Sequence, residues 1–436
     1  MRIKVSPSVG FKIDLSKIAP DKSISHRSVI FSLLSYKPSF VKNYLQGEDT
    51  LNTLEIAKKL GLVVKEEKDG LVFIPPKQLK EPSEILDCGN AGTAIRLYLG
   101  LLSAREGMFV LSGDCYLNAR PMKRVVEPLR QIGASIFGRD GGNLAPLVVI
   151  GKPCLNAFNY VSKIASAQVK SALILSGLYA KGECKYIEPQ LSRDHSERML
   201  MGMGANLESK LNPNGALELK IFPQKNPLNP LEIDIPADPS SAFFFALAIA
   251  ITPNSRGILR NVLLNATRIE AFRVLEQMGV PITYREYSST YESIGDIEIS
   301  SPNYLKAIEI HQRIAWLIDE LPALAIAMAC AKGVSKVSNA KELRVKETDR
   351  IVAIVRNLQL CGIEVKELED GFEICGGDFK MCEVPSYGDH RIAMSFAIAG
   401  LRSGITITQA EYINISFPNF LEILNAITQV EVDNES

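Results

Sequence analysis

The stretch "GNAGTAIRLYLGLLSA", residues 89–104, places a glycine-containing polar turn directly before a long apolar run. The run carries a charge only at Arg96 and has no polar face, which is typical of a helix surrounded by other structure. Five other runs of this kind occur: "SVIFSLLS" from Ser28, "SAQVKSALILSGLYA" from Ser166, "SSAFFFALAIAI" from Ser240, "DELPALAIAMACA" from Asp319 and "DHRIAMSFAIAGL" from Asp389. With the apolar part of the first run counted from Thr93, successive starting points lie 65 to 79 residues apart. The sequence therefore predicts six structural repeats.

A second landmark recurs with the same spacing. Five helical segments end at Gly61, Gly133, Gly204, Gly279 and Gly362, and strand-like alternation follows each of them. Glycine suits the left-handed residue that ends many helices, and the later turn signals "KDG", "PNG" and "EDG" suit tight hairpins. Each repeat is therefore predicted to contain two helices and a hairpin.

The repeats predict two domains, because 436 residues exceed what one hydrophobic core usually organises. Little sequence remains for a sixth hairpin after "FPNFLEILNAI", whereas the chain starts with the strand-like segments "MRIKV" and "FKIDL". We expect these N-terminal strands to complete the last repeat, which makes one domain discontinuous. The expected domains are residues 20–236 and residues 1–19 plus 237–436, each of three repeats, with both crossings next to a proline.

The composition excludes several classes of function. The chain has 49 basic and 49 acidic side chains, so it lacks the basic excess expected of a nucleic-acid-binding protein. It has neither a signal-peptide-like start nor an apolar run of about 18 residues, so we expect a cytoplasmic protein with no membrane association. The eight cysteines include no CxxC pair and the four histidines lie far apart, so no metal site is expected.

Polar segments precede all six apolar runs: "DKSISHR", "GNAGT", "ASAQ", "ADPSS", "IDEL" and "YGDHR". The start of a helix presents unpaired N–H groups and partial positive charge, which favours anions. A single such segment is most often only an N-cap. Six of them in one register, with arginine or lysine nearby, favour an anion-binding cleft between the domains.

Five strings beside these helix starts combine basic and acidic residues: "DKSISHR" (21–27), "GNAGTAIR" (89–96), "NARPMKR" (118–124), "LRVKETDR" (343–350) and "YGDHRIAM" (387–394). Together they resemble the motifs of the 5-enolpyruvylshikimate-3-phosphate synthase family, and the match extends from about residue 21 to residue 418. The resemblance implies an α/β fold of two similar domains, each with three helix-and-sheet units around buried parallel helices. This inside-out α/β barrel is the enolpyruvyl transferase fold, and its two domains close on the substrates.

The resemblance also implies the reaction. An enzyme of this family transfers the enolpyruvyl group of phosphoenolpyruvate to the 5-hydroxyl of shikimate 3-phosphate in chorismate and aromatic amino acid biosynthesis. The mechanism is addition and elimination through a tetrahedral intermediate, without a cofactor. The family further implies inhibition by glyphosate in the phosphoenolpyruvate position, where glycine at position 92 predicts sensitivity. We also expect the protein to be a monomer.

Two polyanionic substrates require several lysines and arginines, with arginine suited to planar bidentate contacts. The resemblance implies that shikimate 3-phosphate is held by Lys22, Ser23, Arg27, Ser166, Ala167, Gln168, Ser192, Arg193, Asp319 and Lys346. It implies that phosphoenolpyruvate is held by Lys22, Asn90, Gly92, Arg120, Gln168, Arg350 and Arg391. The implied catalytic residues are Asp319, Glu347 and Lys22.

Two of these roles have simpler alternatives. Asp319 could be only the N-cap of a helix, and Glu347 could be an ion-pair partner of a site arginine. Three positions depart from better-known family members, because Ala167 replaces a serine, His195 replaces a tyrosine and Ile415 stands where some members have a lysine.

Two other functions compete with this interpretation. The sister enzyme UDP-N-acetylglucosamine enolpyruvyl transferase uses a cysteine shortly before an Arg-Pro pair, and Cys115 lies five residues before Arg120. The strings "DKSISHR", "LRVKETDR" and "DHRIAM" have no evident use on a nucleotide sugar, so we interpret Cys115 as a bystander. A catalytically silent anion-binding protein is disfavoured because binding alone would not need Asp319 and Glu347.

Overall fold

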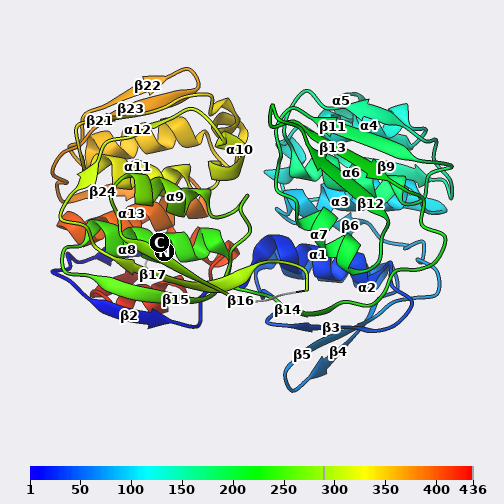
Figure 1. Ribbon diagram of the computed structural model, residues 1–436, viewed down its shortest axis with the longest axis horizontal. Helices are drawn as coiled ribbons and strands as arrows, with labels where there is room; N and C mark the ends of the chain where they lie inside the picture. Colours follow the sequence, from blue (N-terminus) through cyan, green and yellow to red (C-terminus); the bar gives the residue numbers. More distant parts are fainter. Residues whose placement is uncertain (288–289, 435–436) are drawn as a thin grey trace. The chain divides into compact units, whose positions relative to one another are not determined.

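The computed structural model describes residues 1–287 and 290–434, and Figure 1 shows the order of their helices and strands. The chain divides into two compact units. The middle unit contains Pro20–Ile235 and Thr290–Glu292, and the terminal unit contains Met1–Ala19, Pro236–Ser289 and Ser293–Ser436. The first crossing lies at the expected position and the second lies one residue before it. The short segment Thr290–Glu292 was not foreseen from the sequence.

The middle unit pairs each buried helix with an amphipathic one. Its helices are α1 (Lys22–Ser32), α2 (Glu48–Lys59), α3 (Gly92–Ser103), η1 (Leu117–Ala119), α4 (Lys123–Gln131), α5 (Arg139–Gly142), α6 (Ala167–Gly177) and α7 (His195–Gly202). Its strands are β3 (Ser39–Lys42), β4 (Val63–Glu67), β5 (Gly70–Ile74), β6 (Leu86–Asp87), β7 (Gly107–Ser112), β8 (Ser135–Gly138), β9 (Leu144–Gly151), β10 (Asn159–Val161), β11 (Cys184–Glu188), β12 (Leu207–Leu211), β13 (Leu217–Ile221) and β14 (Glu232–Asp234). They form the sheets β14-β3-β5-β4, β6-β7-β9-β8 and β10-β11-β13-β12.

The terminal unit repeats this plan. Its helices are α8 (Pro239–Ile251), α9 (Glu270–Gln277), α10 (Ile314–Leu317), α11 (Leu321–Ala329), η2 (Lys341–Val345), α12 (Arg350–Leu360), α13 (His390–Ser403), η3 (Ala410–Ile415) and α14 (Phe420–Asn425). Its strands are β1 (Arg2–Val5), β2 (Lys12–Leu15), β15 (Arg256–Leu263), β16 (Ile282–Tyr287), β17 (Ile294–Ser300), β18 (Leu305–Lys306), β19 (Glu309–Ile310), β20 (Ala331–Lys332), β21 (Val334–Val337), β22 (Val365–Leu368), β23 (Gly371–Cys375), β24 (Cys382–Pro385), β25 (Ile405–Thr408) and β26 (Val430–Asp433). Its larger sheets are β16-β17-β15-β2, β19-β21-β23-β22 and β24-β25-β1-β26, and β18 pairs with β20.

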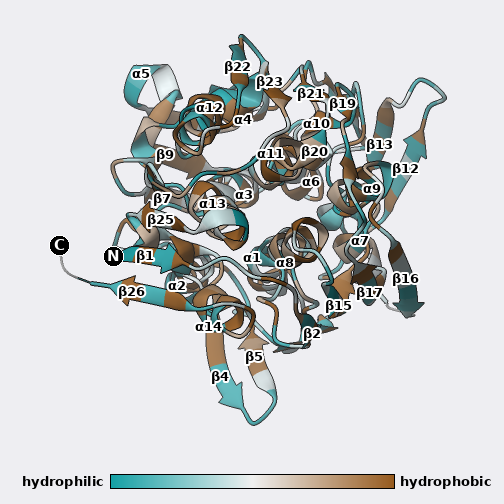
Figure 2. Cartoon of the chain, turned by 90° about the vertical axis from the view of Figure 1, so that its left-hand side faces the viewer, coloured by the Kyte–Doolittle hydropathy of each residue, from teal (hydrophilic) through white to brown (hydrophobic). Residues whose placement is uncertain are grey.

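The six predicted buried helices are confirmed as α1, α3, α6, α8, α11 and α13. Every residue of α8 and of α11 is buried, as expected of helices without a polar face. Figure 2 colours α11 largely brown and shows strands of the terminal unit around it. The five glycines after the amphipathic helices have φ angles between 79° and 104°, so the predicted left-handed helix ends are also confirmed.

One close approach fixes a glycine in the core of the middle unit. Helices α3 and α6 meet at Gly100, where an added Cβ would lie 2.3 Å from the carbonyl oxygen of Ala172. Only glycine permits this backbone contact, because the opposing atom belongs to a helix that cannot move aside alone.

The fate of the N-terminal strands was predicted only in part. Strand β1 lies between β25 and β26 and completes the last repeat, as expected. Strand β2 instead pairs in parallel with β15 of the fourth repeat, so that part of the prediction was wrong. The reason lies in a shared sheet pattern, since each four-stranded sheet of the described residues has one outer strand that pairs in parallel with its neighbour, and in five of these six sheets that strand comes from an earlier segment of the chain. Strand β14 has the same role beside β3.

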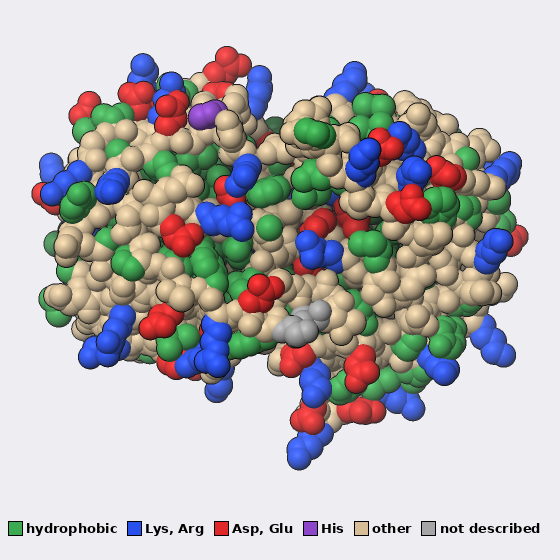
Figure 3. All heavy atoms as spheres, viewed as in Figure 1, with side chains coloured by type: hydrophobic (Ala, Val, Ile, Leu, Met, Phe, Trp, Pro, Cys, Tyr) green, Lys and Arg blue, Asp and Glu red, His purple; other side chains and the backbone are tan. Residues whose placement is uncertain are grey.

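The described helices include none with the length and hydrophobicity needed to span a membrane. The described residues also contain no cluster of three histidine, cysteine or carboxylate side chains suited to a metal ion. On the face shown in Figure 3, basic and acidic side chains are intermixed rather than gathered into patches of one sign.

Candidate active site

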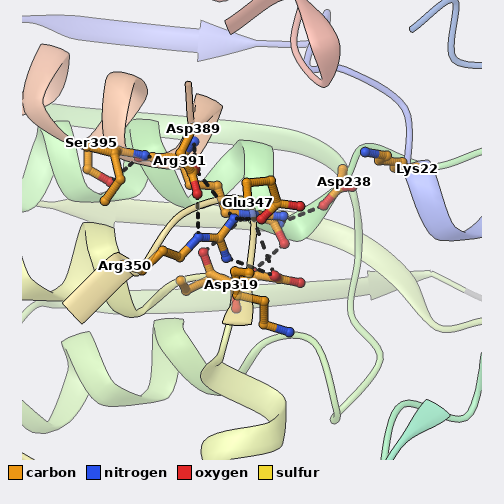
Figure 4. Close-up of polar contacts among 12 residues, drawn as sticks. Lys22, Asp238, Asp319, Glu347, Arg350, Asp389, Arg391 and Ser395 are labelled. Atoms are coloured by element: carbon orange, nitrogen blue, oxygen red, sulfur yellow. Dashed lines mark hydrogen bonds and ion pairs between the residues drawn. The ribbon is translucent and has the colours of Figure 1, made fainter. Parts of the chain in front are cut away.

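In the terminal unit, the buried guanidinium of Arg350 is surrounded by carboxylates (Figure 4). Arg350 is the first residue of α12, and its side chain is 1% exposed. Its Nε donates to Oδ2 of Asp389 at 2.7 Å, its Nη2 donates to Oε2 of Glu347 at 2.7 Å, and its Nη1 lies 3.6 Å from Oδ1 of Asp319. Nη1 has no hydrogen-bond acceptor among the residues that the structure describes. This N–H group is therefore available to a ligand anion.

Neighbouring carboxylates keep the guanidinium of Arg350 protonated. Burial lowers the pKa of the guanidinium, but the negative charges of Asp389, Glu347 and Asp319 outweigh burial and raise that pKa above its usual range. A buried cation with several carboxylates remains protonated at any pH at which the protein is folded. The cluster thus holds a permanent positive charge in a fixed orientation.

Asp389 connects this cluster to a helix start. It is the N-cap of α13, and its Oδ1 accepts hydrogen bonds from the backbone N–H groups of Arg391 at 2.8 Å and Ile392 at 3.4 Å. One carboxylate therefore caps α13 and orients Arg350. Asp389 was absent from the residues expected in the site, although its place before a buried helix in "YGDHR" was a usable signal.

Arg391 and Asp319 form the more accessible side of the cluster. Nη1 of Arg391 donates to the backbone oxygen of Asp319 at 3.1 Å, and its Nε lies 3.6 Å from the carboxylate of Asp319. Their side chains are 14% and 20% exposed, respectively. Helix α11 starts at Leu321 with Glu320 in the N-cap position, so Asp319 is not that N-cap. The carboxylate of Asp319 instead faces two guanidinium groups.

Glu347 forms an ion pair with a basic side chain, and Lys346 forms one with an acidic side chain. The ion pair of Glu347 with Arg350 agrees with the alternative considered for Glu347, whose side chain is 26% exposed. Nζ of Lys346 lies 2.9 Å from Oε1 of Glu342, and the side chain of Lys346 is 20% exposed. Both residues lie in the segment between η2 and α12.

In the middle unit, α1 positions Lys22, Ser23 and Arg27. Lys22 is the first residue of the helix, and its Nζ lies 2.5 Å from Oδ2 of Asp49 on α2. Arg27 is buried, and it donates to the hydroxyls of Ser196 at 2.8 Å and Ser171 at 3.1 Å. Its Nη1 also donates to the backbone oxygen of Ser23 at 3.0 Å. Three hydrogen bonds therefore hold the Arg27 guanidinium next to the first turn of α1.

A second group of residues lies at the start of α3. Nη2 of Arg120 donates to Oδ1 of Asn90 at 2.5 Å, and Nδ2 of Asn90 donates to Asp114 at 2.8 Å. Gly92 is the first residue of α3, and a Cβ added to it would lie 2.9 Å from Nη1 of Arg96 and 3.2 Å from Nη1 of Arg120. The glycine leaves space for these two guanidinium groups.

Gln168 connects α6 to the same group. Its Oε1 accepts from Arg96 at 2.8 Å and from Arg124 at 3.2 Å, and its Nε2 donates to Oγ1 of Thr93 at 3.2 Å. Ser166 is the N-cap of α6 and Ala167 is its first residue. Arg96 was noted in the string "GNAGTAIR" but was assigned to neither ligand, and Arg124 was not expected in the site, although it lies in the string "NARPMKR".

The segment that carries Ser192 and Arg193 is anchored by a buried ionic network. The hydroxyl of Ser192 is 2.9 Å from both carboxylate oxygens of Glu188. The ammonium of Lys170 on α6 lies 2.9 Å from Glu188 and 2.7 Å from Glu197, and its side chain is fully buried. Burial lowers the pKa of Lys170, but the two carboxylates outweigh it and raise the pKa. The Ser192 hydroxyl is thus occupied within the protein.

Three further residues were singled out from the sequence. His195 is buried, and its Nδ1 lies 2.6 Å from Oε1 of Glu292. Glu292 belongs to Thr290–Glu292, the segment between two parts of the terminal unit that is assigned to the middle unit. Cys115 is exposed. Ile415 ends η3 and is half-buried, and the structure provides no basic side chain at that position.

Comparisons with known proteins agree with these features. Residues 12–424 match the family model of EPSP synthase (3-phosphoshikimate 1-carboxyvinyltransferase). Proteins named 3-phosphoshikimate 1-carboxyvinyltransferase from Wolinella succinogenes and Nitratiruptor sp. are 60% identical over 434 residues and 57% identical over 429 residues. These alignments cover 99% and 98% of this chain and 98% and 99% of the relatives.

Solved structures give the same result for the fold. An EPSP synthase from Acinetobacter baumannii is 38% identical, with a TM-score of 0.85, and the match covers 99% of this chain and all of that one. The enolpyruvyl transferase NikO from Streptomyces tendae shares the fold at 13% identity with a TM-score of 0.73. The two-domain α/β fold expected from the sequence is therefore confirmed, and the chain belongs to the EPSP synthase family.

Proposed function

We propose that the residue clusters of the two units act on the same pair of substrates, shikimate 3-phosphate and phosphoenolpyruvate. As a member of its family, the chain transfers the enolpyruvyl group of phosphoenolpyruvate to the 5-hydroxyl of shikimate 3-phosphate in aromatic biosynthesis and releases phosphate. The observation that carries the proposal is the Arg350 cluster, which combines fixed cations with two partly exposed carboxylates.

Phosphoenolpyruvate is the ligand of the arginines. Its phosphate and carboxylate suit the free Nη1 of Arg350 and the accessible guanidinium of Arg391 in one unit, and Arg120 with Asn90 and the start of α3 in the other. Bidentate hydrogen bonds from arginine fix the orientation of such planar anions. The backbone at Gly92 can approach the same ligand without an intervening side chain.

Shikimate 3-phosphate is the ligand of the first turns of α1 and α6. Lys22, Ser23 and Arg27 supply charge and hydrogen-bond donors at the start of α1. Ser166, Ala167 and Gln168 surround the start of α6, whose unpaired N–H groups favour a phosphate. Arg193 and Lys346 are further candidates, whereas the Ser192 hydroxyl would first have to leave Glu188.

The carboxylates serve proton transfer. In the addition step, Asp319 takes the proton of the 5-hydroxyl while that oxygen forms a bond to C2 of phosphoenolpyruvate, and Glu347, which first takes up a proton from solvent, gives it to the methylene carbon. In the elimination step, the methyl carbon returns a proton to Glu347, the double bond reforms, phosphate leaves with its electron pair, and Asp319 passes its proton to the departing phosphate. Lys22 and the arginines stabilise the charge that develops on the phosphate.

The test is phosphate release from phosphoenolpyruvate with and without shikimate 3-phosphate. The wild-type chain releases phosphate only with both substrates, and Asp319→Asn and Glu347→Gln each lower kcat by about 10²-fold or more. Glu369→Gln is the matched control, because the Glu369 side chain is 87% exposed and forms a surface ion pair with Lys341. No release by the wild type would favour the silent anion-binding alternative, and full activity of both variants would refute the assigned roles.

Three finer statements belong to the same proposal. Glyphosate occupies the phosphoenolpyruvate position beside Gly92. The enzyme acts as a monomer, because each chain contains both groups of site residues. It works in the cytoplasm, where a reducing environment keeps thiols free, and all eight of its cysteines are free.

A further inference from the structure

Cys361 and Cys382 bring two sulfur atoms into contact away from the residues assigned to the active site. Their Sγ atoms are 3.3 Å apart. Cys361 is the C-cap of α12, and Cys382 is the first residue of β24. The backbone N–H of Lys380 donates to the carbonyl oxygen of Cys361 at 2.8 Å, so the two segments are also joined by a main-chain hydrogen bond. The contact is therefore part of a packed junction.

The two thiols differ in accessibility. Cys361 is fully buried, whereas Cys382 is half-buried at the edge of its sheet. Cys382 is therefore the thiol of the pair that is closer to solvent and to a small oxidant, and the sulfur of the buried Cys361 lies 3.3 Å from its sulfur. This arrangement is that of an attacking cysteine with a resolving cysteine.

The hydrogen bond between the thiols agrees with the roles that accessibility gives them. Either thiol could donate in this bond; with the S–H of Cys361 as the donor, the bond lowers the pKa of Cys382 and raises that of Cys361. A thiolate is the reactive form of cysteine towards oxidants. Cys382 is therefore the more nucleophilic sulfur of the pair.

We propose that Cys361 and Cys382 are a reversible oxidation site that forms an intramolecular disulfide when the protein meets a hydroperoxide. The Cys382 thiolate attacks the peroxide, which breaks the O–O bond, takes up a proton, releases an alcohol or water and leaves a sulfenic acid. The Cys361 sulfur then bonds to that sulfur and displaces a second water, with the Cys361 proton leaving on it. The two sulfurs together lose two electrons, which the peroxide gains.

The geometry permits this bond with little movement. A disulfide requires an S–S distance of about 2.05 Å, so the sulfurs must approach by only about 1.3 Å. The bond would close the loop that contains β22 and β23 and would link the end of α12 to the start of β24. Because Cys361 captures the sulfenic acid, the pair also protects Cys382 from irreversible oxidation to sulfinic acid.

Trypsin separates the relevant cysteines, which makes the test direct. Cys361 lies in the peptide 357–366, Cys375 in 367–380 and Cys382 in 381–391. The full chain is treated with hydrogen peroxide, the remaining thiols are alkylated, and the peptides are identified by mass spectrometry. The expected product is a disulfide-linked pair of the peptides 357–366 and 381–391, with a mass two hydrogens below the sum of the two peptides. Dithiothreitol should separate the pair. The oxidised protein should still run as a single chain in non-reducing electrophoresis.

Variants make the assignment specific. Cys375→Ser should keep the link, because Cys375 is the thiol between the two in sequence but is not bonded to either of them in the structure. Cys361→Ser should abolish it and leave Cys382 to gain two oxygens that dithiothreitol does not remove. The proposal is overturned if peroxide oxidises the exposed Cys115 while both thiols of the pair stay alkylatable, or if the link forms between chains or through Cys375.

Discussion

The buried Arg350 guanidinium donates from Nε to Oδ2 of Asp389 at 2.7 Å, and the two side chains are 1% and 0% exposed. Arg350 starts α12, and Asp389 caps α13, so the hydrogen bond joins the starts of two helices. It also leaves Nη1 of Arg350 directed away from Asp389 for a ligand. The pair therefore has a structural and a binding role at the same time.

Asp389→Asn should destabilise the chain, because it leaves a buried cation without its main counterion. Breaking a buried ion pair by removing one partner costs about 3 to 5 kcal/mol. Equilibrium unfolding in urea measures this loss. The matched control is Asp349→Asn, because asparagine is as good an N-cap for α12 as aspartate and only the partly exposed ion pair with Arg344 is lost, so it should cost about 1 kcal/mol or less. Equal losses for the two variants would contradict a special role of the Arg350–Asp389 pair.

Arg391→Ala and Arg120→Ala should each weaken the binding of phosphoenolpyruvate more than the binding of shikimate 3-phosphate. The loss of one charged hydrogen bond is worth about 1.5 to 3 kcal/mol, which is roughly a 10- to 150-fold change in affinity. The two residues belong to different units, so the proposal requires that variants in both units show the same preferential loss of phosphoenolpyruvate binding. Calorimetric titration of each variant with each substrate provides the measurement. If both substrates weaken equally, the residues are assigned to the wrong ligand.

His26 should make the chain acid-sensitive. Its Nδ1 lies 2.7 Å from Oγ1 of Thr53, and burial, followed by the charge of Lys22, lowers the pKa of His26 to about 3. The unfolded chain binds a proton at this residue below its ordinary pKa near 6.5, whereas the folded chain does not. This contribution to stability is therefore complete above pH 6.5 and is lost as the pH falls towards 3.

The size of this effect can be measured between pH 7 and pH 5, where it amounts to about 2 kcal/mol of unfolding free energy. His26→Gln should remove that part of the acid dependence, and the exposed His311→Gln should not. Urea unfolding at the two pH values gives the comparison. The same acid dependence in all three proteins would show that His26 titrates normally in the folded state.

Gly92→Ala should relieve inhibition by glyphosate and also impair the binding of phosphoenolpyruvate. The added methyl group would lie 2.9 Å from Nη1 of Arg96 and 3.2 Å from Nη1 of Arg120, so at least one guanidinium must shift. We expect both the inhibitory concentration of glyphosate and the KM for phosphoenolpyruvate to rise, with little change in the KM for shikimate 3-phosphate. Steady-state kinetics provide these three values. Unchanged inhibition would remove Gly92 from the site.

Much of the fold could be predicted from the sequence, because its signals are local. Apolar runs without a polar face identified the buried helices, and glycines with left-handed φ angles ended the amphipathic ones. The partner of β2 could not be predicted, because an alternating strand does not show which distant sheet edge accepts it. The segment Thr290–Glu292 is similar, since only tertiary contacts, such as that of Glu292 with His195 and that of Tyr291 with Glu232, show where it belongs.

Site residues could be predicted where a sequence motif contained them. The contacts and the charge of a residue could not be predicted where they depend on a partner far away in the sequence. Asp389, Arg96 and Arg124 lay inside the quoted strings, and only the structure shows that they hold Arg350 and Gln168. The charge of Lys170 inside an apolar run had no visible reason in the sequence. Its partners Glu188 and Glu197 lie 18 and 27 residues further along the chain, beyond any helical spacing.

The most direct test of the account is a crystal structure of the chain with shikimate 3-phosphate and a phosphoenolpyruvate mimic such as glyphosate. The account predicts that Lys22 and Arg27 contact the phosphate of shikimate 3-phosphate, while Arg120 from one unit and Arg350 and Arg391 from the other contact the mimic. The Asp319 carboxylate should lie within hydrogen-bond distance of the 5-hydroxyl. A mimic held by residues of one unit alone, or a 5-hydroxyl beyond the reach of Asp319, would contradict it.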